Sequence, residues 1–394
     1  MVKNFFGGIY DYLKRTDKIF WLLTLTASFY GFCLIASQQR NDTVNFLKTQ
    51  IIAVSLGYIA AVIISVIDYN FIAKLWWLFA GISLALTIAV FFIGIQVSGT
   101  DDVGWIRLPG GMTFQPSELT KICFILTFSK HLAYLTEINK LKTFVGVMSL
   151  AAHALIPIGL IHLQGDDGAA LVFAFMFIIM SFMAGVQLRY FIILFSAILC
   201  AVPFIWTKVL NDDQKNRLLV LFGTDDTNFQ TYGWQQYQGK VSIASGGFFG
   251  KGYYNGPRVA KEMVPYQEND FIFTVAGEEL GFIGCVFILL LFVLILFKTL
   301  RISSQACNPL GKNICIGFFS LIGIQVIINL GMVLGLLPVV GITLPFLSSG
   351  GSSVACLYLG VGLVQSVYMH PTDSDDKPVK VEISKTIQGS IFAP

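Results

Sequence analysis

Long apolar runs, separated by polar connections, divide this chain from residue 19 to residue 369. A helix needs about 20 predominantly apolar residues to cross a bilayer, and in lipid only helices and closed barrels satisfy their backbone hydrogen bonds. Runs of this length occur ten times, so we expect ten membrane-spanning helices. We place them at residues 19–37, 46–67, 71–97, 117–136, 143–162, 167–185, 189–208, 270–298, 313–338 and 350–369.

The composition of the chain agrees with this reading of the apolar runs. The sequence is 55% hydrophobic and 12% charged, with a mean hydropathy of +0.72. A soluble globule of 394 residues could not remove that much apolar surface from water. We therefore predict an all-α polytopic membrane protein.

Charge and cysteine content argue against nucleic-acid binding and against a fold held together by disulfides or metal ions. The net charge is only +3, from 26 basic and 23 acidic residues, so the sequence carries no signal for nucleic-acid binding. The seven cysteines lie mostly inside apolar runs, and no C-x-x-C pair occurs. We interpret them as small buried hydrophobic residues rather than as a disulfide or metal framework.

Lysine and arginine mark one set of connections as cytoplasmic. With the N-terminus inside, the cytoplasmic segments contain residues such as Lys14, Lys142 and Arg301, whereas the short outer loops contain few basic residues. Ten spans then place both termini in the cytoplasm. We expect a cytoplasmic N-terminus at residues 1–18, a transmembrane domain at 19–370 and a polar cytoplasmic tail at 371–394.

One connection, residues 209–269, is much longer than the others and lies outside, between the seventh and eighth spans. Long loops in compact domains are usually functional. This loop contains Arg217, and its stretch WQQYQGKVSIASGGFFGKGYYNG combines aromatic rings with Lys240. Aromatic faces stack on sugars and basic side chains pair with phosphates, so a glycosylated phosphate ligand fits. A segment that rests on lipid headgroups fits the same composition.

The stretch FQPSELTK, residues 114–121, opens the fourth expected span with an acid and a base. Pro116 suits the first turn of a helix, because the N–H that proline lacks has no intrahelical partner there. Glu118 and Lys121 lie three residues apart, a spacing that lets their side chains meet. The pair could simply anchor the span at the membrane interface. A lysine inside a span equally indicates a functional site, and both interpretations stay open.

Two further stretches place polar groups at expected outer helix ends. QGDDGAAL puts Asp166 before the sixth span, where capping is the simpler interpretation and facing a polar cavity is the alternative. SSGGSS puts Ser352 and Ser353 at the start of the tenth span, whose free N–H groups could hold an anion such as a pyrophosphate. A flexible turn with small residues for packing is the simpler interpretation of SSGGSS.

The stretch VPYQENDFIFTVAGEELGFIG, residues 264–284, places acids where the eighth span begins. Asp270 follows the long loop directly, in the position of an N-cap at the outer membrane face. At about 100° per residue, Glu278 returns to within about 80° of the Asp270 face, and Glu279 points nearly opposite. Capping explains Asp270 but neither glutamate. Acids at that depth should line a cavity or meet a base such as Lys121.

Together these stretches resemble the motifs of the SEDS family of bacterial cell-envelope proteins. WIRL and FQPSELTK match the family patterns W-I-x-L and F-Q-P-S-E-L-x-K, and SIASGGFFGKG resembles its glycine-rich run. DFIFTVAGEELGFIG and NLGMVLGLLPVVGITLPFLSSGGSS match two longer patterns almost throughout. QGDDGAAL matches loosely, because Gly165 and Ala169 replace a proline and a threonine, and Glu268 stands where the family usually has histidine.

The resemblance implies a ten-span fold and peptidoglycan glycosyltransferase activity at the outer face of the bacterial cytoplasmic membrane. The implied substrate is lipid II, a disaccharide-pentapeptide on undecaprenyl pyrophosphate. A class B penicillin-binding protein, which is a transpeptidase, is the implied partner. A divalent cation, Mg²⁺ or Mn²⁺, is the implied cofactor, at a site that the sequence leaves unknown. The family's essential aspartate matches Asp270.

We therefore expect Asp270 to act as general base on the acceptor sugar, with undecaprenyl pyrophosphate as leaving group. Lys121, Lys240 and Arg217 are the candidates for binding phosphate, and Glu118 is expected to orient Lys121. The remaining candidates for substrate binding are Asp166, Glu278, Ser352 and Ser353.

Two other functions use the same features. A lipid II flippase would also need acids and a lysine inside a bundle, although its polar residues should continue through the middle of the membrane and to both sides. A non-catalytic scaffold for the transpeptidase would need none of the acids. The sequence does not distinguish elongation, division and sporulation.

Overall fold

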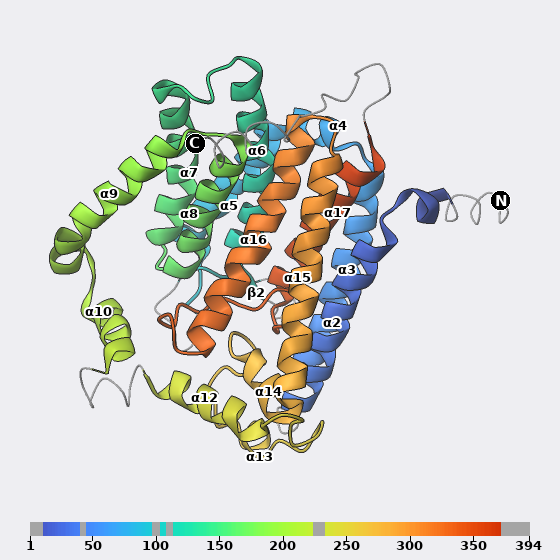
Figure 1. Cartoon of the computed structure of the whole chain (residues 1–394), viewed down its shortest axis with the longest axis vertical. Helices are drawn as coiled ribbons and strands as arrows, with labels where there is room; N and C mark the ends of the chain where they lie inside the picture. Colours follow the sequence, from blue (N-terminus) through green and yellow to red (C-terminus); the bar gives the residue numbers. More distant parts are fainter. Residues whose placement is uncertain (1–10, 40–44, 97–102, 108–112, 224–232, 372–394) are drawn as a thin grey trace, which may run out of the picture.

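The chain folds into a bundle of long helices, seen in the computed structural model of Figure 1. The structure describes residues 11–39, 45–96, 103–107, 113–223 and 233–371. Within these residues the only sheet is a two-stranded one, in which β1 (Ile106–Arg107) pairs antiparallel with β2 (Thr113–Phe114). The all-α prediction is therefore confirmed.

The helices follow one another along the chain, with long connections between α5 and α6, between α9 and α15, and between α16 and α17. They are α2 (Lys18–Gln38), α3 (Phe46–Val66), α4 (Tyr69–Lys74), α5 (Trp76–Ile93), α6 (Pro116–Glu137), α7 (Phe144–His162), α8 (Asp167–Ala184), α9 (Leu188–Phe204), η1 (Ile205–Val209, a π-helical turn), α10 (Asp212–Leu219), η2 (Val220–Phe222, a 3₁₀ turn), α12 (Trp234–Gly246), α13 (Pro257–Ala260), α14 (Ile272–Glu279), α15 (Gly281–Gln305), α16 (Pro309–Val333) and α17 (Gly351–Met369).

Nine of the described helical segments are long and apolar enough to cross a membrane. The tenth expected span, 117–136, coincides with α6, which is long enough but carries too many polar and charged residues to count among these nine. Most of α6 is buried, and it packs against α5, α16 and α17. A helix surrounded by other helices need not be apolar all round, because protein rather than lipid contacts it.

Two expected spans are broken in the structure. The span expected at 71–97 is divided at Leu75 into α4 and α5, and the span expected at 270–298 is divided at Leu280 into α14 and α15. The second break has a clear cause, since Gly281 has a φ of +66°. A Cβ at this position would lie 2.2 Å from the backbone nitrogen of Gly250, so only glycine fits.

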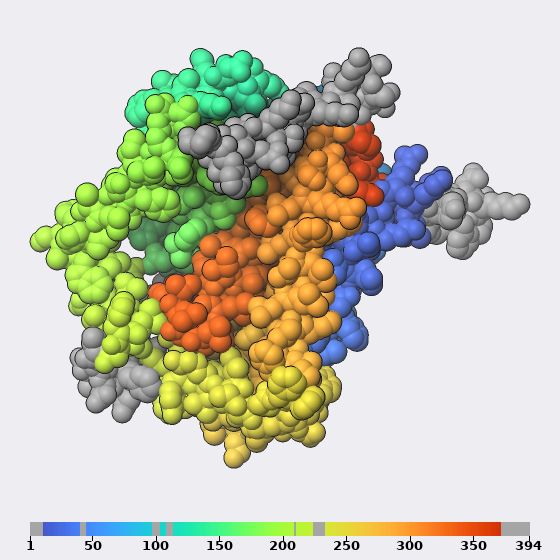
Figure 2. Space-filling view, in the orientation of Figure 1, coloured from blue at the N-terminus to red at the C-terminus, as the bar shows by residue number. Residues whose placement is uncertain are grey.

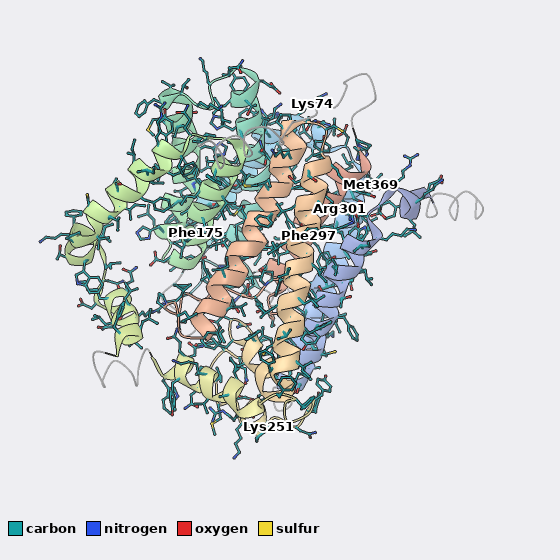
Figure 3. All side chains as sticks on the ribbon, viewed as in Figure 1. Lys74, Phe175, Lys251, Phe297, Arg301 and Met369 are labelled. Carbon is teal, nitrogen blue, oxygen red and sulfur yellow. The ribbon has the colours of Figure 1, made fainter. Side chains whose placement is uncertain are left out.

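The long connection expected at 209–269 is folded where the structure describes it. The helices α10, α12 and α13 gather at one end of the bundle, which we call the loop end (Figure 1). Lys251 lies at the loop end, and Lys74 lies near the opposite end (Figure 3). Residues 1–10, and all but the first residue of the polar tail expected at 371–394, lie outside the described residues. The expected domain boundaries therefore stay predictions.

Helix α9 stands apart from the rest of the bundle. Only 6% of its apolar window, within Leu188–Lys208, is buried, and Phe191 is the one buried residue of α9. The ribbon leans away from the bundle in Figure 1, and the surface is hollowed between this helix and α16 in Figure 2.

Helices α3 and α17 form the closest helix pair in the core. A Cβ on Gly57 would lie 3.0 Å from the Cα of Ala355, and a Cβ on Gly362 would lie 2.7 Å from the carbonyl oxygen of Ala61. Small residues at the crossing let the two backbones approach, which is the main source of helix association in lipid. This contact supports the start of α17, where polar groups of the candidate site lie.

Substituting Gly362→Ala should destabilise the folded protein by about 1–3 kcal/mol, because the added methyl group would overlap the α3 backbone. Gly81→Ala in α5 is the matched control, since no atom lies within 4 Å of a Cβ at that position. Alanine is also the better helix former, so the control should unfold at the same temperature as the parent or slightly above it. Thermal unfolding of purified protein in one detergent measures both, and equal midpoints would refute this account of the crossing.

Candidate functional site

Asp270 lies at the loop end, in the turn that leads into α14. Its side chain and backbone together are only 7% exposed. Asn329 of α16 donates its Nδ2 hydrogens to the carbonyl oxygens of Asp270 and Ile342, each at 2.7 Å. This amide fixes the backbone of Asp270 against α16 and against the segment that follows α16.

The prediction that Asp270 caps the eighth span is wrong. The N-cap of α14 is Phe271, and no side chain accepts a hydrogen bond at that cap. Asp270 lies one residue before the N-cap position of α14. Its carboxylate is therefore not occupied by the helix that it precedes.

The charge state of Asp270 follows from this environment. Burial raises the pKa of the Asp270 carboxyl to about 7, and the nearby Glu268 adds to the rise, although the backbone N–H of Asp270 opposes it. Among the residues that the structure describes, Asp270 forms no ion pair with a lysine or arginine. The structure thus holds a buried carboxylate that can gain or lose a proton near neutral pH.

A second group of polar side chains, which we call the polar cluster, lies where α6 and α8 begin. It consists of Gln115, Ser117, Glu118, Lys121 and Asp166. Lys121 Nζ lies 2.8 Å from Glu118 Oε1, and both side chains are buried, so the predicted pair at i, i+3 is confirmed. Because both side chains are buried, the pair lies inside the bundle and not on an exposed surface.

Asp166 caps α8, as its sequence position predicts, and its second oxygen is hydrogen-bonded inside the polar cluster. Its Oδ1 accepts a hydrogen bond from the backbone N–H of Ala169 at 2.8 Å and so caps α8. Its Oδ2 accepts a hydrogen bond from Gln115 Nε2 at 2.9 Å, inside the polar cluster. Capping therefore holds one oxygen, while the other faces the polar cluster.

The start of α17 connects the polar cluster with the Asp270 turn. Ser352 Oγ accepts a weak hydrogen bond from the backbone N–H of Gln115 at 3.4 Å, and Ser353 is buried beside it in sequence. The backbone N–H of Ser349 donates to the carbonyl oxygen of Glu268 at 2.8 Å. The SSGGSS segment thus contacts the polar cluster through Ser352 and the turn before Asp270 through Ser349.

The predicted basic residues of the long loop reach a neighbouring segment, the one that follows α16. Arg217 of α10 donates from Nη1 to the carbonyl oxygen of Val339 at 3.1 Å. Lys240 of α12 is exposed, and its Nζ lies 2.9 Å from where a Cβ on Gly335 would be. Both cations therefore lie beside residues 335–339, which lead to the Ile342 carbonyl that Asn329 holds.

Helix α10 contacts the bundle through polar side chains. Besides the contact of Arg217, Gln214 Nε2 donates to Asp167 Oδ2. The other oxygen of Asp167 lies 2.6 Å from His162 Nδ1. The side chains of Gln214, Asp167 and His162 are polar and partly exposed, in contrast to the buried polar cluster.

The prediction for Glu278 needs correction. Its basic partner is Lys251, whose Nζ lies 3.0 Å from Glu278 Oε1, and not Lys121. The backbone N–H groups of Arg258 and Val259 also donate to the Glu278 carboxylate, each at 3.0 Å. Donors from the protein itself occupy its oxygens, which argues against a role of Glu278 in substrate binding.

Sequence reasoning missed three contributors to the site. Asn329 and Gln115 position Asp270 and Asp166, and Glu268 acts on the pKa of Asp270. Gln115 belongs to the FQPSELTK motif, and Glu268 lies two residues before Asp270, so their positions in the sequence were an available signal. Asn329 could not be connected with Asp270 from spacing alone, because 59 positions separate them.

A known protein family matches nearly the whole chain. The family model described as "Cell cycle protein", which covers FtsW, RodA and SpoVE, matches residues 17–373. The chain belongs to this family. It is the SEDS family that the sequence motifs indicated.

Curated relatives span nearly the whole chain. The probable peptidoglycan glycosyltransferase FtsW of Trichlorobacter lovleyi is 32% identical over 373 residues, which cover 90% of this chain and 93% of the relative. The peptidoglycan glycosyltransferase MrdB of Escherichia coli K12 is 29% identical over 356 residues, covering 90% of this chain and 94% of MrdB.

Solved structures share the fold. A chain from a study entitled "Structural coordination of polymerization and crosslinking by a peptidoglycan synthase complex" superposes with a TM-score of 0.77 at 27% identity, covering 91% of this chain and 99% of that one. The rod shape determining protein RodA of Thermus thermophilus gives a TM-score of 0.66 at 27% identity, covering 91% and 98%. The protein is thus a multi-pass bacterial membrane protein of this fold.

The divalent cation that the resemblance implies was tested against the side chains present. No three histidine, cysteine, aspartate or glutamate side chains lie together as a metal site within the described part of the chain. The buried carboxylates of Glu118, Asp166 and Glu278 are already bound by protein donors. These residues do not form an all-protein site for Mg²⁺ or Mn²⁺.

Lys121→Met should lower the stability of the folded protein by about 3 kcal/mol, because it leaves the Glu118 carboxylate buried without its cation. The double substitution Lys121→Met with Glu118→Gln removes both charges and should recover most of that loss. Denaturation midpoints of the two variants and the parent measure the effect. If the single and double variants were equally destabilised, the pair would not be the source of the loss.

Proposed function

We propose that this protein is a peptidoglycan glycosyltransferase that polymerises lipid II into glycan strands. The observation that carries the proposal is the state of Asp270, a buried carboxylate at the loop end that neither caps a helix nor pairs with a base among the described residues. A general base needs such a group, with a pKa close to the working pH. The names of the family relatives support the same activity.

In the proposed reaction Asp270 accepts the proton of the 4-hydroxyl group of the acceptor N-acetylglucosamine. The oxygen then attacks C1 of the donor N-acetylmuramic acid, and the bond from C1 to the lipid pyrophosphate breaks. The leaving group is undecaprenyl pyrophosphate, and attack from the opposite side inverts the configuration at C1. Asn329 keeps Asp270 in position by holding its backbone carbonyl, so little reorganisation accompanies the proton transfer.

The leaving pyrophosphate carries negative charge that the site has to stabilise. Arg217 and Lys240 lie beside residues 335–339 and can approach a phosphate from the long loop. Lys121 and the free N–H groups at the start of α17, near Ser352, are the candidates deeper in the bundle. Glu118 and Asp166 orient Lys121 and the start of α8 in this arrangement.

The arrangement of α9 suits a substrate with a long lipid chain. Because α9 makes few contacts with the other helices, a prenyl chain could enter from the bilayer between α9 and α16, where Figure 2 shows a hollow. The sugar and phosphate groups would then arrive at the loop end while the lipid chain stays in the membrane.

The same proposal includes orientation and partners. Both termini are cytoplasmic, which places Lys74, Lys142 and Arg301 inside in accordance with the positive-inside rule and puts the loop end outside. A class B penicillin-binding protein would crosslink the new strand, and the exposed apolar face of α15, which includes Val293 and Phe297, is available to lipid or to a partner helix. The cellular process is cell-wall synthesis in shape maintenance, division or sporulation.

Asp270→Asn should lower the rate of lipid II polymerisation by about 10²–10⁴-fold while leaving the protein folded, because it removes a general base and keeps the size of the side chain. Asp212→Asn is the matched control, since the Asp212 side chain is 94% exposed in the same loop. Glycan products from labelled lipid II, made by each purified variant, are the measurement.

The alternatives give different results in the same assay. Full polymerisation by Asp270→Asn would end the assignment of the base. A parent protein that moves lipid II between leaflets without making glycan would be a flippase. A parent inert on lipid II, alone and together with its transpeptidase, would leave the scaffold role.

Polymerisation by the parent protein should also depend on pH. Only ionised Asp270 accepts a proton, and its pKa is raised to about 7, so kcat/KM should fall about tenfold per pH unit below that value and level off above it. Glu268→Gln removes a neighbouring negative charge and should move this acidic limb to lower pH. Initial rates from pH 5 to 9 test both statements, and a limb unmoved by Glu268→Gln would contradict the second.

A further inference from the structure

The short helix α14 has Asp270 before its first turn and two buried glutamates at its end. Asp270 precedes its first turn, and Glu278 and Glu279 form its last residues. All eight residues of α14 are buried, which is unusual for a helix that carries two carboxylates. What holds these two charges in place therefore also holds the helix that begins beside Asp270.

A glycine-rich loop, residues 247–259, wraps around the Glu278 end of α14. Glu278 is 0% exposed. Its carboxylate accepts hydrogen bonds from Lys251 Nζ and from the backbone N–H groups of Arg258 and Val259, each at 3.0 Å. The charge that Glu278 carries is thus matched from this loop.

Glu279 binds a different part of the loop and a distant helix. It is also 0% exposed. Its Oε1 accepts from the backbone N–H of Gly256 at 3.2 Å, and its Oε2 accepts from the backbone N–H of Tyr254 at 3.2 Å. Ser37 of α2 donates its hydroxyl group to the same Oε2 at 2.6 Å. Glu279 therefore joins the loop, α14 and the end of α2.

The backbone of the loop is equally close to α14. The N–H groups of Lys251 and Gly252 donate to the carbonyl oxygens of Glu278 and Glu279 at 3.0 and 2.9 Å. A Cβ on Gly250 would lie 2.1 Å from the carbonyl oxygen of Glu279, so the loop can approach only through glycine. Loop and helix form one closely packed unit.

We propose that Glu278 and Glu279 are positioning residues for Asp270: by binding the glycine-rich loop they hold α14, and with it the turn that contains the proposed base. This inference rests on the proposed function. It assigns these acids a role that neither substrate binding nor capping explains. Their protein donors, one lysine, one serine and four backbone N–H groups, show that they act on the protein and not on the substrate.

The mechanism follows from burial. An Asp270 turn that is held firmly keeps water away from the carboxylate and leaves it a strong base. A loosened turn would admit water, return the pKa of Asp270 toward the ordinary carboxyl value of about 4 and weaken the base. It would also misplace the carboxylate relative to the acceptor hydroxyl group. Both effects change the chemical step more than the binding of substrate.

The test compares Glu278→Gln with Glu262→Gln, an exposed glutamate in the same region. Glu278→Gln keeps the shape of the side chain but removes the charge that Lys251 and the backbone N–H groups bind. We expect kcat to fall on the order of 10²-fold with little change in KM, and the acidic limb of the pH–rate profile to move to lower pH. Glu262→Gln should reproduce the parent profile.

A second variant tests the same contact without changing any charge. Gly256→Ala leaves every charge in place, but its Cβ would lie 2.9 Å from the Cγ of Glu279 and so disturb the same contact. It should shift the acidic limb in the same direction. Folded Glu278→Gln and Gly256→Ala proteins whose pH–rate profiles superimpose on that of the parent would overturn the proposal.

Hydrogen–deuterium exchange separates this inference from the proposed function, since it needs no activity. In Glu278→Gln and Gly256→Ala, exchange should rise in peptides covering residues 267–276 as well as in the loop, and Glu262→Gln should match the parent. Faster exchange confined to residues 247–259 would show that the loop does not hold the Asp270 turn, whatever reaction the protein catalyses. A parent without glycosyltransferase activity but with the expected exchange pattern would refute only the function.

Discussion

The organisation of the loop end depends on one constraint, the cost of burying a charge away from water. Each buried carboxylate there must find donors, because an unpaired buried charge is strongly unfavourable. Glu118 has Lys121, and Glu278 has Lys251 together with backbone N–H groups. Asp270 has no lysine or arginine partner among the described residues, and burial raises its pKa to about 7, so the carboxyl can hold a proton instead of an unpaired charge. The same requirement that builds the scaffold thus leaves one acid available for proton transfer.

Much of the fold could be predicted from the sequence because the bilayer imposes a length on apolar helices. The ends of α7 and α17 lie within one residue of the expected spans, and the pair of Glu118 and Lys121 follows from helix geometry. Helix α6 shows where composition becomes a weaker guide. Its polar residues are tolerated because other helices surround it, which depends on packing and not on its own sequence.

The sequence indicated which residues belong to the candidate site but not which of them contact one another. The motifs placed Asp270, Asp166 and Lys121 among the candidates, yet α14 begins at Ile272 with Phe271 as its N-cap, so Asp270 does not occupy a capping position. The partner of Glu278 was missed because Lys251 belongs to a loop that folds back 27 residues away. Such contacts are set by tertiary structure, since glycines far apart in the chain must meet before the loop can approach α14.

Rigid and loosely held parts are separated at the loop end, and the proposed chemistry requires both. A base works best when it is held at a fixed distance from the group that it deprotonates, which the buried contacts of α14 provide. A lipid-linked substrate must still enter from the bilayer and its product must leave. Helix α9 has few contacts of its own, and the partly exposed contacts of Gln214 and Arg217 connect its neighbour α10 to the bundle. Movement on that side would admit a lipid chain without displacing α14, so access and positioning need not compete.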